Sequence, residues 1–428
     1  MREGTIHVIG AGLAGLSAAV RLTGAGVKTV VHDAAAAGGG RCKSFFDPAL
    51  GAEIDNGNHL ILSGNQAALD YLTRIGSSDR MSGPGVALFD FADLRTGERW
   101  RLRPNEGRAP WWLFDRKRRA PGTSLQEYFA PLPIFWSRPD ATVERAMRCE
   151  GPLYERLWRP LLLAGLNTDP KESSARLAGA LLRGTLGGGG KACRPLIASE
   201  GLSPTFVDPA IRFIACNGGT VRLGDRLRDI RFEADRAVAL EFESKSIRFG
   251  WDDAVVVAVP PWAARVLLPG VEAPEEFRGI VNAHFLVPAP RSHPPILGVI
   301  GGLTQWLFAY GDRLSVTISA AGDLIDWPRE ALAESIWREV AELTGVSPAL
   351  PPCRIVKEKR ATFAATPAQD ARRPPSRTQW SNVFLAGDWV QTGLPATIEG
   401  AVRSGRDAAS LALATAAKPK VFAGAALA

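Results

Sequence analysis

The sequence predicts an α/β fold in which two domains are interleaved along the chain. Its first 33 residues have the pattern of a strand, a glycine loop, a helix and a second strand. Further strand-rich blocks lie in the middle and near the end of the chain, and two helical or mixed blocks separate them. This order favours one domain assembled from distant segments over two consecutive domains.

The N-terminal unit is the best-defined element. Residues 5–9 (TIHVI) form a short apolar run that predicts a buried strand, and a glycine loop occupies 10–15. Apolar residues then recur with helical spacing over 13–24, and a second strand covers 27–32 and ends at Asp33. A strand, loop, helix and strand of this length predict one βαβ unit of a Rossmann-like domain.

Later elements follow from alternation, turn residues and helical periodicity. The stretch from about 80 to 195 is rich in Trp, Pro and Arg and predicts a mostly helical, irregular block. An amphipathic helix over 327–345 ends at Gly345, and a C-terminal helix begins near Thr397. Strands are predicted over 215–223, 230–243, 252–262, 297–302, 314–320 and 382–388.

Composition is that of an ordinary globular protein, with 22% charged residues and a net charge of +7 over 428 residues. Five cysteines without a CxxC pair predict neither a disulfide framework nor a zinc site, and we expect no metal. The N-terminus lacks the pattern of a signal peptide. No apolar run of about 18 residues predicts a membrane span. We therefore expect a cytoplasmic protein that meets a membrane only at its surface.

The glycine loop has the spacing Gly10-x-Gly12-x-x-Gly15. Gly10 allows a tight turn, Gly12 lets the backbone approach a pyrophosphate, and Gly15 lets the helix pack on the strand. The predicted helix then begins with Leu13 and Ala14. At this N-terminal end of the helix, free backbone N–H groups can bind phosphates. An acid at the end of the next strand, Asp33, is placed to bind a ribose hydroxyl. Together these features predict dinucleotide binding, and the alternative is a structural glycine turn.

A second turn distinguishes FAD from NAD. Gly39, Gly40 and Arg41 lie six to eight residues after Asp33. The glycine pair lets the chain pass close to a cofactor, and Arg41 can meet a phosphate or the flavin. This spacing resembles the D/E-x5-GGR pattern of amine oxidase and phytoene desaturase-like flavoproteins, many of which have Glu where this chain has Asp33. The resemblance implies FAD as the cofactor.

The same resemblance extends to the far end of the chain. It places Asp388, in Ala386-Gly387-Asp388, near the ribityl–pyrophosphate section of FAD. It also places a helix start at Thr397 and Ile398 under the flavin pyrimidine ring, where a helix N-terminus favours the negative charge of a reduced flavin. In relatives, the position of Leu227 lets a backbone group touch adenine; the alternative for Leu227 is a plain strand residue.

Within this superfamily the chain resembles one branch, the hydroxysqualene dehydroxylases, which are squalene-associated and desaturase-like. Asn58 stands where the branch leads us to expect Gln, and it keeps the amide. The matching segments run through the chain: DNGNHLIL (55–62), LWRPLLLAGLNTDP (157–170), GLSPTFVDPA (201–210), IVNAHF (280–285), TQWLF (304–308), EKRATFAATP (358–367) and AGDWVQTGLPATIEGAVRSGR (386–406).

This resemblance implies reductive dehydroxylation of hydroxysqualene, a C30 allylic alcohol, to squalene in squalene and hopanoid biosynthesis. Hydroxide is a poor leaving group, so an acid must protonate it or a donor must stabilise it. Candidates are His59 and Asp55, with Arg360 and Glu399 as second-line candidates for charge near the flavin. His59 can instead make a structural hydrogen bond, and Asp55 can instead hold backbone N–H groups in the turn at 56–57.

We expect a discontinuous FAD-binding domain over 1–80, 195–270 and 355–415, and a substrate-binding domain over 81–194 and 271–354. The substrate domain should shape a long apolar tunnel. Residues 416–428 are an Ala-rich tail without a clear pattern, which we expect to be disordered.

A hydrophobic substrate must come from a membrane or from a partner enzyme of the pathway. Trp111, Trp112, Leu113 and Phe114 form an apolar knot, and the basic residues Arg116, Lys117, Arg118 and Arg119 follow directly in the sequence. Aromatic side chains beside basic ones suit a bilayer with anionic lipid, here the inner face of the cell membrane. The alternative is a core aromatic pair beside a solvated basic loop. We expect no nucleic-acid partner.

Three rival functions remain open. A carotenoid-type desaturase needs the same tunnel and flavin. An amine oxidase usually frames its flavin with aromatic residues near the C-terminal motif; Thr392-Gly393-Leu394 occupies that stretch here, which argues against an amine substrate. A scaffold stabilised by FAD in a pathway complex is the non-enzymatic alternative.

Overall fold

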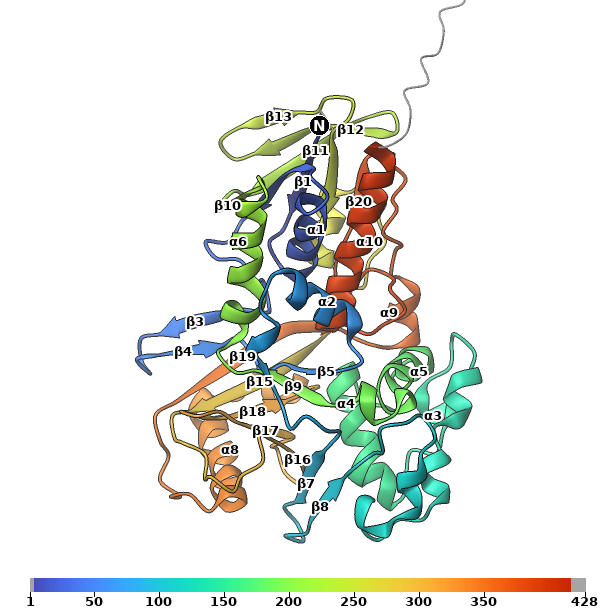
Figure 1. The fold of residues 1–428 in the computed structure, drawn as a ribbon, viewed down its shortest axis with the longest axis vertical. Helices are drawn as coiled ribbons and strands as arrows, with labels where there is room; N and C mark the ends of the chain where they lie inside the picture. Colours follow the sequence, from blue (N-terminus) through green and yellow to red (C-terminus); the bar gives the residue numbers. More distant parts are fainter. Residues whose placement is uncertain (1–3, 417–428) are drawn as a thin grey trace, which may run out of the picture.

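The glycine loop follows the central strand of a five-stranded parallel sheet with the order β10-β2-β1-β14-β20. The computed structural model describes residues 4–416 (Figure 1). Strands from three distant parts of the chain therefore pair in one sheet. Their bounds are β1 Thr5–Ile9, β2 Lys28–Asp33, β10 Thr220–Leu223, β14 Ala254–Val257 and β20 Val383–Leu385.

Each face of this sheet is covered by a different layer. Alternate residues of β14 point to opposite faces, so Val256 packs in the helical layer while Val255 and Val257 pack against the antiparallel sheet. In Figure 1 the C-terminal helix α10 lies beside the N-terminal helix α1, and the antiparallel sheet lies at the top. The helical layer comprises α1 Leu13–Thr23, α2 Gln66–Arg74, α6 Asp208–Cys216 and α10 Ile398–Ala416, and the antiparallel sheet comprises β11 Leu227–Glu233, β12 Arg236–Phe242 and β13 Ser246–Arg248.

A second, seven-stranded sheet has the order β19-β15-β18-β17-β16-β7-β8 and is antiparallel except for the β16–β7 pair. Helix α8 (Arg329–Thr344) packs on one face of this sheet. The strands are β7 Phe89–Asp93, β8 Arg99–Leu102, β15 Phe277–Phe285, β16 Ile296–Ile300, β17 Trp306–Ala309, β18 Leu314–Ile318 and β19 Cys353–Phe363.

A block of short helices packs at the β7–β8 end of the seven-stranded sheet. Most of its turns are 3₁₀ helices, and η6 is a π-helical turn that leads directly into α4. The block comprises η2 Trp111–Phe114, η3 Arg116–Arg118, η4 Gln126–Phe129, η5 Leu132–Trp136, α3 Val143–Ala146, η6 Tyr154–Trp158, α4 Arg159–Leu166, α5 Ala175–Gly184, η7 Leu186–Gly188 and η8 Gly190–Ala192.

Small elements connect the two sheets. The hairpin β3–β4 and the three-stranded sheet β5-β9-β6 lie between them (Figure 1). The connecting elements are β3 Ser44–Asp47, β4 Ala52–Asp55, β5 Leu60–Leu62, η1 Ser78–Arg80, β6 Met81–Ser82, β9 Pro195–Ala198, η9 Ser203–Val207 (a π-helical turn), α7 Pro261–Leu267, η10 Gly322–Leu324 and α9 Pro367–Ala371.

Most predicted elements are present, with three corrections. The strand expected from 215 begins at Thr220, because α6 continues to Cys216. The stretch 230–243 is a hairpin and not one strand, with Ala234 at φ +50° in its turn. The strand expected over 252–262 ends at Val257, because α7 begins at Pro261. The block from 80 to 195 is mostly helical and irregular, as predicted, and it also contains the short strands β6, β7 and β8.

The expected domain boundary at residue 355 falls inside β19, which pairs with β15 along its length. The division of the chain into two domains therefore remains a proposal, with β19 assigned to the seven-stranded sheet. Apart from residue 416, the expected tail lies outside the described residues.

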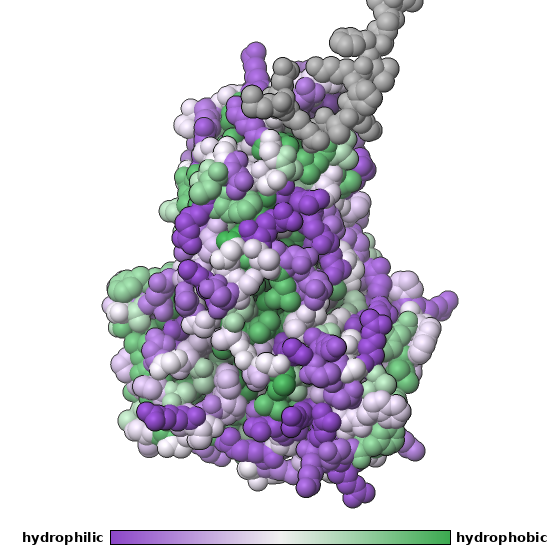
Figure 2. All heavy atoms as spheres, viewed as in Figure 1, coloured by the Kyte–Doolittle hydropathy of each residue, from purple (hydrophilic) through white to green (hydrophobic). Residues whose placement is uncertain are grey.

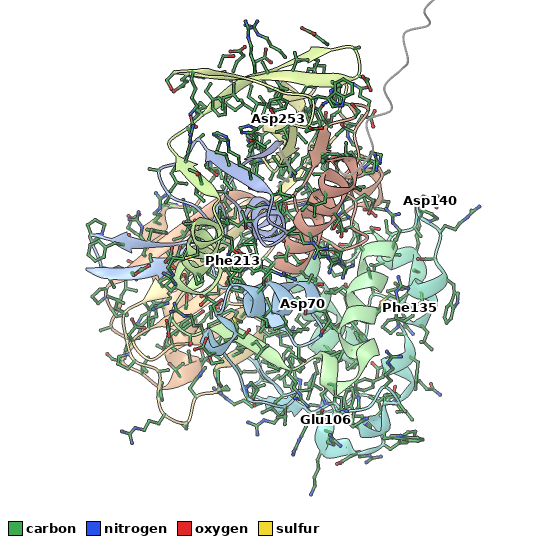
Figure 3. The ribbon with its side chains drawn as sticks, turned by 45° about the horizontal axis from the view of Figure 1, so that its top comes forward. Asp70, Glu106, Phe135, Asp140, Phe213 and Asp253 are labelled. Carbon is green, nitrogen blue, oxygen red and sulfur yellow. The ribbon has the colours of Figure 1, made fainter. Side chains whose placement is uncertain are left out.

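Among residues 4–416, no helix has both the length and the apolar character that crossing a membrane requires. On the face shown in Figure 2, hydrophobic side chains gather in small patches between hydrophilic ones. Figure 3 shows Asp253 at one end of the molecule and Glu106 at the other, so the parallel sheet and the helical block lie at opposite ends.

Candidate cofactor and active site

The three glycines of the loop between β1 and α1 meet different demands. Gly10 has a φ of +109°, and a Cβ there would lie 2.4 Å from the carbonyl oxygen of Ala258. A Cβ at Gly15 would lie 1.8 Å from the carbonyl oxygen of Gly10, whereas a Cβ at Gly12 would meet no atom of the chain within 4 Å. The fold itself therefore requires Gly10 and Gly15. Gly12 borders open space at the start of α1, where N–H groups favour a phosphate.

Asp33 lies beside this loop at the end of β2. Its carboxylate accepts hydrogen bonds from the backbone N–H of Ala11 at 2.6 Å and of Ala35 at 2.8 Å. The N–H of Asp225 donates to the carbonyl oxygen of Asp33 at 2.8 Å, which brings the start of β11 and its first residue, Leu227, to the same edge. This arrangement suits the ribose of a dinucleotide. Leu13 and Ala14, the first residues of α1, have buried side chains, so they can contribute backbone N–H groups only.

The second glycine turn lies against the first. The N–H of Gly39 donates to the carbonyl oxygen of Ala11 at 2.8 Å, and Gly39 and Gly40 both have positive φ values, +99° and +60°. The guanidinium of Arg41 then donates to the carboxylate of Asp388 at 2.7 Å and to the carbonyl oxygen of Ala361. Motifs from the two ends of the chain therefore meet through one ion pair.

The C-terminal segment joins β20 to α10. Gly387 has a φ of +153°, and a Cβ there would lie 2.5 Å from Nε1 of Trp389, so the turn needs glycine. Thr397 caps α10, because its hydroxyl oxygen accepts a hydrogen bond from the N–H of Gly400 at 3.1 Å. The helix begins at Ile398, where the sequence predicts its start.

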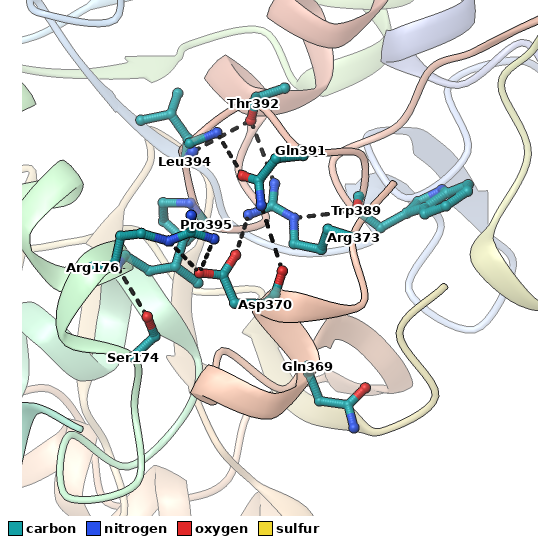
Figure 4. Close-up of polar contacts among 12 residues, drawn as sticks. Ser174, Arg176, Gln369, Asp370, Arg373, Trp389, Gln391, Thr392, Leu394 and Pro395 are labelled. Carbon is teal, nitrogen blue, oxygen red and sulfur yellow. Dashed lines mark hydrogen bonds and ion pairs between the residues drawn. The ribbon is translucent and has the colours of Figure 1, made fainter. Parts of the chain in front are cut away.

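A buried arginine that the sequence does not reveal shapes the loop after Asp388. Arg373 donates to the carbonyl oxygens of residues 388, 389 and 390 at 3.4, 3.2 and 2.7 Å. Figure 4 shows the contact with Trp389. Asp370 binds Arg373 at 3.1 Å and also Arg176 of α5 at 2.7 Å. The loop is therefore fixed both to α9 and to the helical block. Arg373 lies in ARRPPS, which has no motif, so only the contacts identify it.

Asp55 is occupied by contacts within the fold. Its Oδ1 accepts hydrogen bonds from the hydroxyl of Ser44 at 2.6 Å and from the N–H of Leu202 at 2.9 Å, and Arg313 lies 3.8 Å from its Oδ2. Burial raises the pKa of Asp55. The expectation that Asp55 holds N–H groups of the turn at 56–57 is corrected, because the N–H group it binds is that of Leu202.

The turn after Asp55 is anchored to the seven-stranded sheet. The amide of Asn58 donates to the hydroxyl of Thr317 at 3.0 Å and accepts a hydrogen bond from the hydroxyl of Tyr310 at 3.3 Å. Asn282 donates to the carbonyl oxygen of Asn56 at 3.4 Å. The asparagine that departs from the expected Gln is therefore a structural anchor for the residue that follows it.

His59, that next residue, is half-buried and makes no hydrogen bond within the described part of the chain. Burial, and secondly the positive charge of Arg41, lower the pKa of His59 to about 4. The imidazole is therefore neutral near pH 7 and retains one N–H donor. Because the positive charge of Arg41 acts on His59, Arg41 and its partner Asp388 lie in the same region of the site as His59.

Arg360 is placed differently. Its exposed guanidinium lies over the rings of Trp262, at 4.8 Å, and Phe277, at 5.8 Å. These contacts hold its charge on aromatic surfaces. Among residues 4–416, Arg360 forms no hydrogen bond or ion pair with His59 or Arg41.

Glu399 is a clamp between two helices. Its buried carboxylate accepts hydrogen bonds from the N–H groups of Ala67 at 3.2 Å and Ala68 at 2.9 Å, in the first turn of α2, and Arg403 binds it at 3.1 Å. A carboxylate at a helix N-terminus is favoured by the free N–H groups and the helix dipole. This placement gives Glu399 a structural role in joining α10 to α2.

The predicted apolar knot is split by the fold. Trp111 and Phe114 are both 68% exposed, whereas Trp112 is only 7% exposed and lies in the core. Trp112 therefore does not face the surface, which corrects the expectation for that residue. Of the basic residues, Arg116 and Lys117 are exposed, and Arg118 and Arg119 are half-buried.

A family model described as flavin-containing amine oxidoreductase matches residues 13–413. The chain is 54% identical to a hydroxysqualene dehydroxylase of Rhodopseudomonas palustris over 96% of its length and 98% of that protein. It is 43% identical to a hydroxysqualene dehydroxylase of Zymomonas mobilis, over 95% of the chain and 98% of that protein.

More distant relatives share the fold. A 15-cis-phytoene desaturase of Synechococcus elongatus is 23% identical over 94% of both chains. Among solved structures, cyclohexylamine oxidase of Brevibacterium oxydans aligns with a TM-score of 0.70 at 18% identity, covering 96% of this chain and 99% of that one. Such a low identity supports the fold and not a shared substrate.

Proposed function

The chain belongs to the flavin-containing amine oxidoreductases and, within them, to the hydroxysqualene dehydroxylases, and from this premise we propose that it reduces hydroxysqualene to squalene. It is an FAD-dependent oxidoreductase. The observation that carries the substrate assignment is the 54% identity over nearly the full length of both chains.

We propose that FAD lies along the predicted motifs. The pyrophosphate lies at Gly12 and the start of α1, next to Leu13 and Ala14, and the ribose lies at Asp33 near the start of β11 at Leu227. The remaining contacts come from Gly39, Gly40, Arg41, Gly387, Asp388, Thr397 and Ile398, with Gly10 and Gly15 shaping the loop. When bound and reduced, FAD supplies the hydride equivalent of the reaction.

In the net reaction the allylic C–O bond breaks, the oxygen takes up a proton and leaves as water, and the carbon gains hydride. We assign His59 to the leaving oxygen. Because its pKa is about 4, it acts as a neutral hydrogen-bond donor and not as an imidazolium acid, and the net proton comes from solvent. Arg41 is held by Asp388 and places positive charge near the site. We assign Asp55 and Glu399 to positioning, because contacts within the fold occupy both carboxylates.

The function is tested by incubating the purified holoenzyme with hydroxysqualene and a chemical reductant under anaerobic conditions, followed by lipid analysis. We expect squalene. A product with an added double bond under oxidising conditions would instead favour a desaturase. FAD that is retained but is never reoxidised by hydroxysqualene would favour a scaffold.

The role of His59 is tested with two variants. His59→Ala removes the donor, and we expect kcat to fall by about 10²-fold, the loss typical of one hydrogen-bond donor to an oxygen that gains negative charge in the transition state. His59→Gln keeps an N–H donor and should retain more activity. The wild-type rate should show no titration of His59 between pH 6 and 8. Unchanged kcat in His59→Ala with normal FAD content would leave His59 a structural residue only.

We also propose that the enzyme collects its substrate at an anionic membrane surface. Trp111 and Phe114 supply exposed aromatic side chains, and Arg116 and Lys117 supply adjacent positive charge, the combination that favours an interface with acidic lipid. Other exposed apolar side chains of the same helical block are Phe129, Leu132 and Trp136.

Sedimentation with vesicles that contain phosphatidylglycerol tests this surface. We expect the double variant Trp111→Ala, Phe114→Ala to bind several-fold less, and Arg116→Glu, Lys117→Glu to lose the dependence on anionic lipid. Trp251→Ala is the matched control, because Trp251 is 71% exposed and lies near Asp253, at the opposite end of the molecule. Equal binding by all variants would disprove the membrane surface and leave delivery to a partner enzyme of the pathway.

A further inference from the structure

The turn between β4 and β5 lies between the flavin motif and the seven-stranded sheet. On the motif side, Asn56 donates from its side-chain amide to the carbonyl oxygen of Arg41 at 3.4 Å and from its N–H to that of Lys43 at 2.9 Å. On the sheet side, the carbonyl oxygen of Asn56 accepts a hydrogen bond from Asn282 at 3.4 Å. His59 is the last residue of this turn, since β5 begins at the next residue. Contacts on both sides therefore fix the turn that carries His59.

The sheet meets this turn with a pair of polar side chains on adjacent strands. Asn282 of β15 lies directly opposite Thr317 of β18 in the antiparallel register, so both side chains stand on the same face of the sheet. The hydroxyl of Thr317 donates to Oδ1 of Asn282 at 2.7 Å. Asn282 is only 2% exposed, so the pair acts where water competes little.

The hydrogen bonds that hold the turn run in one direction. The amide nitrogen of Asn282 faces the carbonyl oxygen of Asn56, so Oδ1 of Asn282 faces Thr317 and can only accept. The oxygen of Thr317 is then free to accept from the amide of Asn58 at 3.0 Å. Oδ1 of Asn58 in turn accepts from the hydroxyl of Tyr310 at 3.3 Å. Each group has one role, so the turn has one orientation on the sheet.

Gly57, in the middle of the turn, gives independent evidence for this close contact. A Cβ at Gly57 would lie 2.9 Å from Nδ2 of Asn282. The φ of Gly57 lies outside the left-handed region, so the backbone conformation does not itself require glycine. The requirement comes from the approach of the turn to Asn282, and a side chain at this position would push the turn away from the sheet.

We propose that Asn282 and Thr317 are positioning residues for His59, because they clamp both ends of its turn and so fix the imidazole in the same region as Arg41. The assignment rests on the proposed function for the role of His59 at the leaving oxygen. Backbone pairing fixes the two strands, so the donor is held in place before the substrate arrives. Neither residue needs to touch the substrate.

The test removes one hydroxyl. Thr317→Val has a similar volume but loses both the acceptor for Asn58 and the donor to Asn282, whereas Thr317→Ser keeps the hydroxyl. Thr304→Val is the matched control, because Thr304 is fully buried and its hydroxyl forms no hydrogen bond among residues 4–416. The FAD content and urea unfolding of each variant establish that it is folded.

The first readout is the protonation of His59, followed by NMR of the holoenzyme labelled with [13C]histidine. His59→Gln identifies its signal among those of the five histidines. We expect His59 of the wild type to stay neutral down to pH 5, because its pKa is about 4. Thr317→Val should raise this pKa toward 6.5, since release of the turn lets water reach the imidazole. Thr317→Ser and Thr304→Val should behave as the wild type.

The second readout is a double-mutant cycle on the reduction of hydroxysqualene. We expect Thr317→Val to lower kcat by about tenfold with KM nearly unchanged, because the donor is misplaced and not lost. In the His59→Ala background the same change should lower kcat no further, since Thr317 acts through His59. Thr317→Ser should restore most of the rate, and Thr304→Val should leave it unchanged.

An equal loss of kcat in both backgrounds, or an unchanged pKa of His59 in folded Thr317→Val, would overturn the assignment while the proposed function stands. If Thr317→Val does not fold, Tyr310→Phe removes the hydroxyl that binds Asn58 and decides by the same two criteria. If the wild type does not reduce hydroxysqualene, the proposed function fails, and the NMR titration alone decides whether the pair positions His59.

Discussion

Replacing Gly12 by alanine should separate cofactor binding from folding. Its φ of −71° and ψ of 174° suit any residue, and its Cβ would meet no atom of the chain. We expect the free energy of unfolding of the FAD-free protein to change by less than about 0.5 kcal/mol. FAD affinity should fall by about tenfold or more, because the methyl group occupies the space where the backbone approaches the pyrophosphate. Chemical denaturation and FAD titration measure the two quantities.

Gly15→Ala is the contrasting variant. Its Cβ would overlap the carbonyl oxygen of Gly10, so we expect the FAD-free protein to lose about 1–3 kcal/mol of stability or more. Equal effects of the two substitutions on folding would contradict these separate roles for Gly12 and Gly15.

The same distinction explains what the sequence could predict at this scale. The positive φ of Gly10, the contact of Gly15 with Gly10 and the cap at Thr397 arise from local backbone geometry, so a motif is enough to reveal them. Arg373 acts on carbonyl oxygens that lie 15 to 17 residues along the chain, and Asp55 binds an N–H group 147 residues away. Such contacts form only when the chain folds, and no residue spacing in the sequence predicts them.

At the scale of elements, Glu399 joins α10 to α2. Glu399→Ala leaves the N–H groups of Ala67 and Ala68 without their acceptor and Arg403 without its partner. We expect a loss of about 1–3 kcal/mol of stability, measured by urea unfolding. Glu399→Gln keeps one acceptor oxygen and should lose less. If Glu399→Ala lowered kcat without lowering the free energy of unfolding, a catalytic role for Glu399 near the flavin would be preferred.

The sequence predicts a strand reliably where all or most of the residues in that strand are apolar. β1, β14 and β20 are central or buried, and their short apolar runs are distinctive. β7, β8 and β19 contain charged residues between their apolar ones, and β19 reads CRIVKEKRATF. Pairing across the sheet stabilises these strands, so their sequence alone is ambiguous.

At the scale of the whole molecule, the protein should lose stability in mild acid. Burial lowers the pKa of His7 and of His284 to about 4. An unfolded histidine titrates near 6.5, so between these values the unfolded chain binds more protons than the folded chain. The free energy of unfolding is therefore retained well above pH 6.5 and falls as the pH drops toward 4, by about 2 kcal/mol for each of these two buried histidines at pH 5.

Urea unfolding at pH 7 and pH 5, at constant ionic strength, measures this loss. His7→Gln removes one contributor and should narrow the difference between the two midpoints. Identical midpoints for the wild type at both values would show that neither histidine is held neutral by the fold.

The sequence predicts that segments distant along the chain alternate between the two sheets, but it does not predict which strands pair. Strand-rich blocks at the start, middle and end implied that distant segments share a sheet, and β1, β14 and β20 do so. The parallel pairing of β7 with β16, about 200 residues later, was not predictable, because nothing in either strand specifies its partner.

The ion pair between Arg41 and Asp388 has a consequence for synthesis of the chain on the ribosome. Arg41 emerges soon after the glycine loop and Asp33, whereas Asp388 emerges 347 residues later, between β20 and α10. Until then the parallel sheet lacks an edge strand and α1 lacks its partner helix. A nascent chain therefore holds only half of a flavin site until β20 and α10 have emerged, so FAD capture should follow their emergence, and the supply of free flavin at that moment becomes part of how the enzyme matures.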